Sequence, residues 1–248
     1  MIIRTLLSPF VMALNHVKSK YQKHLRISAV VYLIISLLVL VGGGMKYNQM
    51  RIEKLAMEQK ITQAQQARID DEQLESYTLL LMKLTRAKLS DFQKVSIAQA
   101  LVRVSGKIFS SLEQRKWFAV LVANESHFNS SAKSSAGAVG LSQIIPKYAA
   151  GFGIPCGITG VLPTELSDVE INLSLGACQF RELINTLDGN TAAALVAYNA
   201  GQNSQSLKQL LSGSTILNQE AANYPSKAFF LRTKADLEEQ KDAKPAKS

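Results

Sequence analysis

The stretch NESHFNSSAKSSAGAVGLSQI, residues 124–144, follows the apolar run KWFAVLVA and leads from it into a Ser/Gly-rich turn. It holds one carboxylate, Glu125, which is the only acid between Glu113 and Glu165. An acid at the end of a helix is most often a solvated surface group. The alternative is a partly desolvated carboxyl, whose pKa is raised by burial and by the negative end of the helix dipole. The rest of the chain has to decide between these two interpretations.

Charge is distributed unevenly along the 248 residues. The hydrophobic content of 47% is enough for a packed domain, and the net charge of +9 raises the question of an acidic partner. Residues 1–90 hold 13 Lys and Arg against 6 acids, whereas residues 91–230 hold 10 against 9. The globular part is therefore almost neutral and lacks a basic stripe with interleaved aromatics, which argues against nucleic acid as a partner.

Residues 27–45, ISAVVYLIISLLVLVGGGM, form an uncharged apolar run. Its length is close to the roughly 17 to 25 residues that cross a bilayer core as a helix. A cleavable signal peptide is the nearest alternative, because glycines end the run, but the preceding residues 1–26 are long for a signal n-region. We expect an uncleaved anchor in the cytoplasmic membrane after a basic N-terminal segment. Lys and Arg are equally frequent on both flanks, so the positive-inside rule leaves the orientation open.

Three further segments follow the predicted anchor. Residues 46–90 are rich in helix-forming residues and contain neither Pro nor Gly, which predicts a helical stalk or a solvated helical linker. Residues 91–230 show helical patterns separated by Gly/Pro turns and no strand alternation, which predicts a mostly α domain. Residues 231–248 are charged and lack aromatics, which predicts a disordered tail.

Several kinds of chemistry are excluded by the sequence. His127 is the only histidine beyond the predicted anchor, and GLSQI lacks the second glycine of a nucleophile elbow. The chain has no H-E-x-x-H motif and no Cys/His cluster with metal spacing. The two cysteines, Cys156 and Cys178, could pair in an oxidising compartment or remain buried thiols.

One lone carboxyl remains as a candidate for catalysis. A carboxyl that stays protonated near neutral pH can act as a general acid on a leaving oxygen. Ordinary glycosidases need a second carboxylate as base or nucleophile. No acid lies between Glu125 and Glu165, so a mechanism with a single acid would have to use the substrate itself.

These residues resemble a known family. ESHFNSSAKSSAGAVGLSQIIPKYA is similar to the signature of the soluble lytic transglycosylase domain family, lysozyme-like enzymes that cut peptidoglycan. The family has Glu-Ser, then a Ser nine residues after the Glu, then Ala-Gly-Ala-x-Gly-Leu-Met-Gln. INLSLGACQFRELI, AALVAYNAG and EAANYPSKA resemble its later motifs, in order, over roughly residues 112–230. The departures are Ser142 for the usual Met, Ser130 where Pro is common and Pro225 after the closing Tyr in place of Val.

The resemblance implies a lysozyme-like helical domain, here preceded by one transmembrane helix and a helical stalk. It implies that Glu125 protonates the β-1,4 oxygen between N-acetylmuramic acid and N-acetylglucosamine. The acetamido group of the substrate would replace the missing second carboxylate, and the lyase reaction would leave 1,6-anhydro ends. Ser134 would orient the acetamido group, and Gln143, Tyr198 and Asn199 would line the sugar site. No metal or other cofactor is called for.

The implied substrate also settles the expected topology. Peptidoglycan lies outside the cytoplasmic membrane, so we expect a single-pass protein of the bacterial inner membrane with its catalytic domain in the periplasm. A tethered cutter suggests local wall opening for an envelope-spanning secretion or conjugation complex, general wall remodelling or a phage enzyme. Two alternatives remain: a hydrolytic muramidase, and a non-catalytic glycan-binding scaffold of an envelope complex.

Overall fold

The computed structural model describes residues 3–242, with side chains for Ser28 and residues 31–242. The side chains of residues 1–26, expected to form a basic segment, lie outside the described residues. The chain divides into two compact units, Met1–Gln65 and Gln66–Ser248. Helix α1, Ile3–Leu84, runs through the first unit and into the second.

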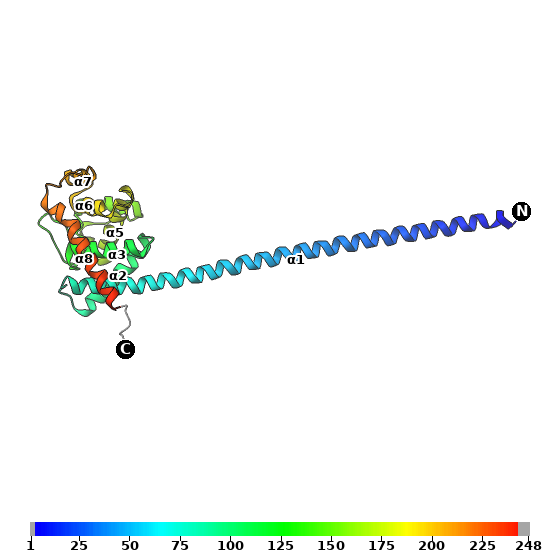
Figure 1. Cartoon of the computed structure of the whole chain (residues 1–248), viewed down its shortest axis with the longest axis horizontal. Coiled ribbons are helices and arrows are strands. Elements are labelled where there is room, and N and C mark those ends of the chain that lie inside the picture. The colour runs from blue at the N-terminus through cyan, green and yellow to red at the C-terminus, as the bar shows by residue number, and fades with distance from the viewer. Residues whose placement is uncertain (1–2, 243–248) are drawn as a thin grey trace. The chain divides into compact units, whose positions relative to one another are not determined.

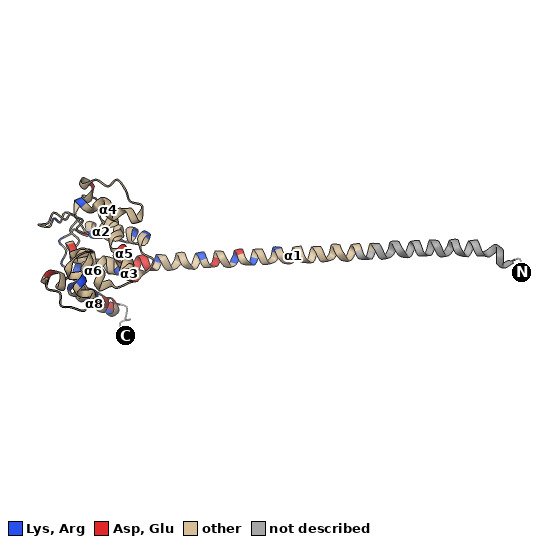
Figure 2. Cartoon of the chain, turned by 90° about the horizontal axis from the view of Figure 1, so that it is seen from above, with Lys and Arg blue, Asp and Glu red and all other residues tan. Residues whose placement is uncertain are grey.

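The first unit holds the apolar run of α1. Within the described part of the chain, Val31–Leu84 is the one helix long and apolar enough to cross a membrane, by length and composition. Its best 18-residue window has a mean hydropathy of 1.5, and none of that window is buried in the structure. Charged residues of both signs follow this apolar run along the helix (Figure 2). The helix expected after the anchor is therefore present as far as Leu84.

The second unit begins at Gln66, earlier than the boundary at residue 91 expected from the sequence. The last turns of α1 belong to its core, because Leu74, Tyr77, Leu81 and Met82 are each no more than 1% exposed. Leu74, Tyr77 and Leu81 are spaced by three and four residues, so they share one face of the helix. The segment expected to be only a stalk thus ends as a core helix of the domain.

Helices build the rest of this unit (Figure 1). The longer ones are α2 (Asp91–Ile108), α3 (Leu112–Ser126), α5 (Val169–Thr186), α6 (Thr191–Ala200) and α8 (Gln219–Asp242). The shorter ones are α4 (Ala149–Gly153), α7 (Gln205–Leu211) and the 3₁₀ turns Pro146–Tyr148, Ile154–Cys156 and Pro163–Ser167. The described residues form no β-strand and only two isolated bridges, Lys133 with Val139 and Val139 with Ile144. The predicted mostly α class is confirmed.

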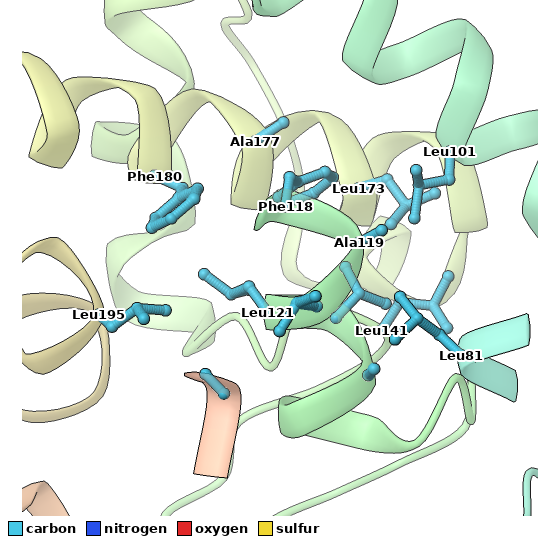
Figure 3. Close-up of a cluster of buried hydrophobic side chains, with 14 of the residues drawn as sticks. Leu81, Leu101, Phe118, Ala119, Leu121, Leu141, Leu173, Ala177, Phe180 and Leu195 are labelled. Atoms are coloured by element: carbon cyan, nitrogen blue, oxygen red, sulfur yellow. The ribbon is translucent and has the colours of Figure 1, made fainter. Parts of the chain in front are cut away.

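Helix α3 lies at the centre of the core. Every side chain over residues 118–123 is fully buried. Figure 3 shows Phe118, Ala119 and Leu121 of this helix surrounded by side chains from other elements, among them Leu101, Leu141, Leu173 and Leu195. Glu125 therefore follows directly after a fully buried stretch of α3 and is itself only partly buried.

Helix α8 continues to Asp242, through residues for which the sequence predicts a disordered tail. Arg232 is only 8% exposed and pairs with Glu113 of α3 at 2.8 Å. Glu239 pairs with Lys116 of α3 at 2.7 Å. The charges that suggest a solvated tail are thus partners of cations and anions on the neighbouring helix. Residues 243–248 of the predicted tail lie outside the described residues.

Cys156 and Cys178 form a disulfide, which joins the turn Ile154–Cys156 to α5. The sequence left this pairing open. Around it a small second core, built on Ile144, Ala149, Leu166 and Leu175, attaches the segment after residue 144 to the same helix. This segment therefore has two anchorages on α5.

Candidate active site

Glu125 lies in the last turn of α3, directly before a sharp change of chain direction. His127, the C-cap of the helix, has φ 51° and Phe128 has φ 63°, so two successive non-glycine residues are left-handed. The Glu125 side chain is partly buried. The hydroxyl of Tyr224, on α8, donates a hydrogen bond to its Oε1 at 2.5 Å.

Burial is the main influence on the Glu125 carboxyl and raises its pKa to about 7. The hydrogen bond from Tyr224 lowers this pKa, and the negative charge of Glu220 raises it. Glu220 and Tyr224 are four residues apart on α8 and so lie on one face of that helix. Burial and the charge of Glu125 raise the pKa of Tyr224 well above its usual range, so this hydroxyl stays a donor. Near neutral pH, both the protonated and the ionised form of the Glu125 carboxyl are therefore populated.

The turn after Glu125 is built by residues with left-handed backbones. Gly137, Gly140 and Gln143 have φ of 83°, 81° and 49°. The side-chain amide of Gln143 donates to the carbonyl of Gly140 at 2.8 Å and to that of Ala132 at 3.3 Å. Gln143 therefore closes the turn with its amide nitrogen.

A groove of about 960 Å³ runs beside this turn. Gln143 is in its lining together with Tyr198 and Asn199, which stand at the end of α6. The remaining lining comes from the segment after residue 144, from α5, from α6 and from the loop between α6 and α7: Ile145, Lys147, Tyr148, Gly151, Phe152, Pro155, Gln179, Glu182, Ala197, Ala200, Gly201, Gln202, Asn203 and Ser204. Three of the five residues expected at the site thus share one groove.

Glu125 and Ser134 do not line this groove. Glu125 is nevertheless close enough to Tyr198 that its charge raises the pKa of that hydroxyl, although burial is the larger cause. Ser134 is exposed, and its Oγ accepts a hydrogen bond from the backbone N–H of Ala138 at 3.0 Å. In this structure the Ser134 hydroxyl is used to shape the turn.

Two residues at the site were absent from the expected set. Tyr224 contacts Glu125 directly, and Asn172 of α5 accepts a hydrogen bond from the Ser142 N–H at 2.8 Å. Both stand in stretches with a recognisable pattern, EAANYPSKA and INLSLGACQFRELI. That pattern was the available signal, but only the fold shows that these stretches meet the turn and the acid.

Ser142, which replaces the Met of the family pattern, does not point into the groove. It is fully buried, and its carbonyl accepts a hydrogen bond from the Tyr198 hydroxyl at 2.8 Å. As for a metal, no group of three His, Cys, Asp or Glu side chains in the described part of the chain is placed to hold one.

Comparisons with known proteins find similarity in sequence and in fold. Residues 112–216 match the sequence model of the transglycosylase SLT domain. The structure resembles an inactive mutant of the lytic transglycosylase Slt from Pseudomonas aeruginosa, in which a glutamate is replaced by glutamine, with a TM-score of 0.51 and 22% identity over 64% of this chain and 28% of that one. It also resembles the 70 kDa soluble lytic transglycosylase Slt70 from Escherichia coli, with a TM-score of 0.52 and 19% identity over 68% of this chain and 30% of that one.

These likenesses confirm the lysozyme-like fold of the domain, and the chain spans less than a third of the length of either protein. The matched residues contain the end of α3 with Glu125, the turn that follows it and the groove-lining end of α6. Over residues 112–216, less than half of its length, this chain is similar to the transglycosylase SLT domain family.

Proposed function

We propose that this chain is a membrane-anchored peptidoglycan lytic transglycosylase with Glu125 as its single acid and base. The observation that carries the proposal is a carboxyl with a pKa of about 7 that accepts a hydrogen bond from Tyr224 and whose charge acts on Tyr198, a residue that lines the groove of about 960 Å³. In the Pseudomonas aeruginosa protein, replacement of a glutamate by glutamine gives an inactive mutant. The same change at Glu125 is the natural test here.

The proposed reaction uses both protonation states of Glu125. The protonated carboxyl gives its proton to the bridging oxygen as the bond from that oxygen to the anomeric carbon of N-acetylmuramic acid breaks. The acetamido oxygen of the same sugar bonds to the anomeric carbon, in the place of a second carboxylate. The ionised carboxyl then takes the proton of the C6 hydroxyl, whose oxygen displaces the acetamido oxygen. A 1,6-anhydro ring forms, no water is consumed and Glu125 is protonated again.

The acids that follow Glu125 in the sequence have structural partners elsewhere. Glu165 accepts a hydrogen bond from the N–H of Leu162 at 2.7 Å, and Asp168 caps α5 by accepting from the N–H of Ile171. Glu170 pairs with Arg103 at 2.6 Å. The carboxylate that acts on the pKa of Glu125 is instead Glu220, whose side chain is exposed on α8. A hydrolytic enzyme with two carboxylates would have two candidates for the second one: Glu220, and Glu182, which lines the groove.

The location follows from the substrate and from the apolar run of α1. We place residues 27–45 in the cytoplasmic membrane and the SLT domain in the periplasm, where peptidoglycan is found. The supporting observation is that no residue of the apolar window, which begins in the helix from Val31 onward, is buried in the structure, so a bilayer can surround it. A tether of this kind suits local cutting of the wall, at an envelope-spanning complex or during wall remodelling.

Product analysis tests the reaction type. The purified protein is incubated with purified peptidoglycan, and the released fragments are analysed by mass spectrometry. Fragments with 1,6-anhydro ends are expected. Fragments with reducing ends would identify a hydrolytic muramidase, and binding to peptidoglycan without release would identify a glycan-binding scaffold.

A further inference from the structure

One face of helix α5 is turned toward the groove-lining Tyr198. Asn172, Gly176 and Phe180 are spaced by four residues and therefore lie along one side of the helix. All three are buried, with Asn172 at 1% and Phe180 at 0% exposure. Each of them contacts either Tyr198 or the turn to which Tyr198 is bonded.

Asn172 makes three hydrogen bonds, and two of them hold that turn. Its Oδ1 accepts from the N–H of Ser142 at 2.8 Å, and its Nδ2 donates to the carbonyls of Val139 at 2.9 Å and of Leu166 at 3.0 Å. Both hydrogens of the amide nitrogen are thereby used. An added Cβ at Gly140 would overlap the Asn172 amide, so the turn and the helix are in close approach. The carbonyl of Ser142, which receives the Tyr198 hydroxyl, is held in place by this contact.

Gly176 allows the same approach one turn further along α5. A Cβ added here would overlap Cβ and Oγ of Ser142 and lie 3.1 Å from the Tyr198 hydroxyl. No side chain larger than hydrogen fits at this position without moving the turn. One further turn along, the Phe180 ring meets the Tyr198 ring edge-on, with centroids 6.2 Å apart and an interplanar angle of 82°.

We propose that Asn172, Gly176 and Phe180 are positioning residues that set where the Tyr198 hydroxyl and ring stand in the groove. The hydroxyl is fixed through the carbonyl of Ser142 and the ring through Phe180, so a single helix face controls both ends of the side chain. This inference rests on the proposed function, because the groove is the sugar site only under that proposal. Displacement of a substrate-lining group by about 1 Å can cost on the order of 10²-fold in rate.

The test uses a substitution that creates a steric overlap and a second substitution that removes this overlap. Gly176→Ala should lower kcat/KM for peptidoglycan fragments by roughly 10²-fold in a protein that still folds. Adding Ser142→Gly removes the Cβ and Oγ that the new methyl group would strike, and should restore most of the activity. Adding Ser142→Ala keeps that Cβ and should not restore it. Gly106→Ala is the matched control, because a Cβ at this helical glycine would only reach ordinary contact with Arg115, at 3.5 Å.

A spectroscopic readout separates this inference from the proposed function. The protein is labelled with ¹³C in its tyrosine rings, and the Tyr198 signal is assigned from its loss in Tyr198→Phe. We expect the signal to shift in Gly176→Ala, to return in the Ser142→Gly double variant and to stay unchanged in Gly106→Ala. If Gly176→Ala does not fold, Phe180→Leu replaces it and should shift the same signal.

An unshifted Tyr198 signal in these variants would overturn the inference, as would rescue by Ser142→Ala as complete as by Ser142→Gly. If the parent protein does not cut peptidoglycan, the proposed function fails, while the Tyr198 signal still decides whether α5 positions this side chain.

Discussion

At the scale of single residues, opposing influences act on the pKa of the Glu125 carboxyl. Burial raises its pKa, whereas the hydrogen bond from the Tyr224 hydroxyl stabilises its charge, and the resulting pKa is about 7. The proposed reaction needs this balance, because the same group first donates a proton and then accepts one. A fully solvated glutamate would be ionised at neutral pH and could not serve as the acid.

The pH dependence of kcat/KM should report this pKa. Glu125 must be protonated in the free enzyme, so kcat/KM should fall as pH rises through about 7 and then drop roughly tenfold per pH unit. The measurement is the initial rate of release from soluble glycan fragments between pH 5 and 9, at substrate concentrations well below KM. A rate that rises steadily across this range would rule out Glu125 as the acid.

Glu220→Gln should move this profile in a defined direction. The charge of Glu220 raises the pKa of Glu125, so its removal should lower that pKa and shift the decline of kcat/KM to lower pH. The maximal rate at acidic pH should stay near that of the parent. Loss of activity at every pH in a folded Glu220→Gln variant would instead favour a hydrolase with two carboxylates.

The pKa of Glu125 also links stability to pH. In the unfolded chain this pKa returns to about 4.5, so between 4.5 and about 7 the folded state binds more protons and its stability falls as pH rises. Glu125→Gln removes this dependence. Its melting temperature should exceed that of the parent above pH 7, and the difference should shrink toward pH 5. A difference that is independent of pH would contradict the burial of the charge.

At the scale of elements, the sequence predicted the helical class and the chain order of the motifs, and the anchor stays a prediction. It did not predict where the domain begins or ends. Lys116 and Arg232 are charged in the sequence and buried in the structure, because Glu239 and Glu113 come to them from helices more than a hundred residues away. Partners of this kind are created by tertiary packing and leave no local pattern. The Tyr224 contact with Glu125 was hidden for the same reason.

Truncated proteins test where the domain begins. A chain that starts at residue 91 lacks the four core side chains supplied by the end of α1, and removal of each such side chain costs about 2–5 kcal/mol. The summed loss is comparable to the whole free energy of unfolding of a domain, roughly 5–15 kcal/mol, so residues 91–248 should not fold. Residues 66–248 should fold and melt cooperatively by circular dichroism. Two truncated proteins of equal stability would show that α1 is dispensable to the core.

A pair of substitutions tests, without truncation, whether the end of α1 packs in the core of the domain. Leu74→Ala, at a fully buried position, should lower the free energy of unfolding of the soluble domain by about 2–5 kcal/mol in urea denaturation. Ile69→Ala, one and a half turns earlier and 55% exposed, should change it by less than about 0.5 kcal/mol. Equal effects would mean that this part of α1 does not pack as the structure shows.

At the scale of the whole molecule, the proposed anchor and the proposed peptidoglycan substrate predict one topology. A reporter enzyme that is active only in the periplasm, fused after Gln65, should be active in a bacterial host, and the full-length chain should sediment with membranes. The uncharged run at 27–45 is the reason, because it is long enough to cross a bilayer core. Recovery of a shortened soluble protein would show instead that this run is a cleaved signal.

The central claim is that Glu125 alone supplies and takes back the proton during glycan cleavage, and the most direct measurement compares Glu125→Gln with the parent on purified peptidoglycan. Gln keeps the size of the side chain and can still accept the Tyr224 hydrogen bond, but it has no carboxyl group that can donate and take back a proton. We expect the variant to sediment with peptidoglycan as the parent does and to release anhydro fragments at least about 10²–10⁴-fold more slowly. Glu165→Gln, the next acid along the chain, should stay within several-fold of the parent. Release by Glu125→Gln at the rate of the parent would contradict the account.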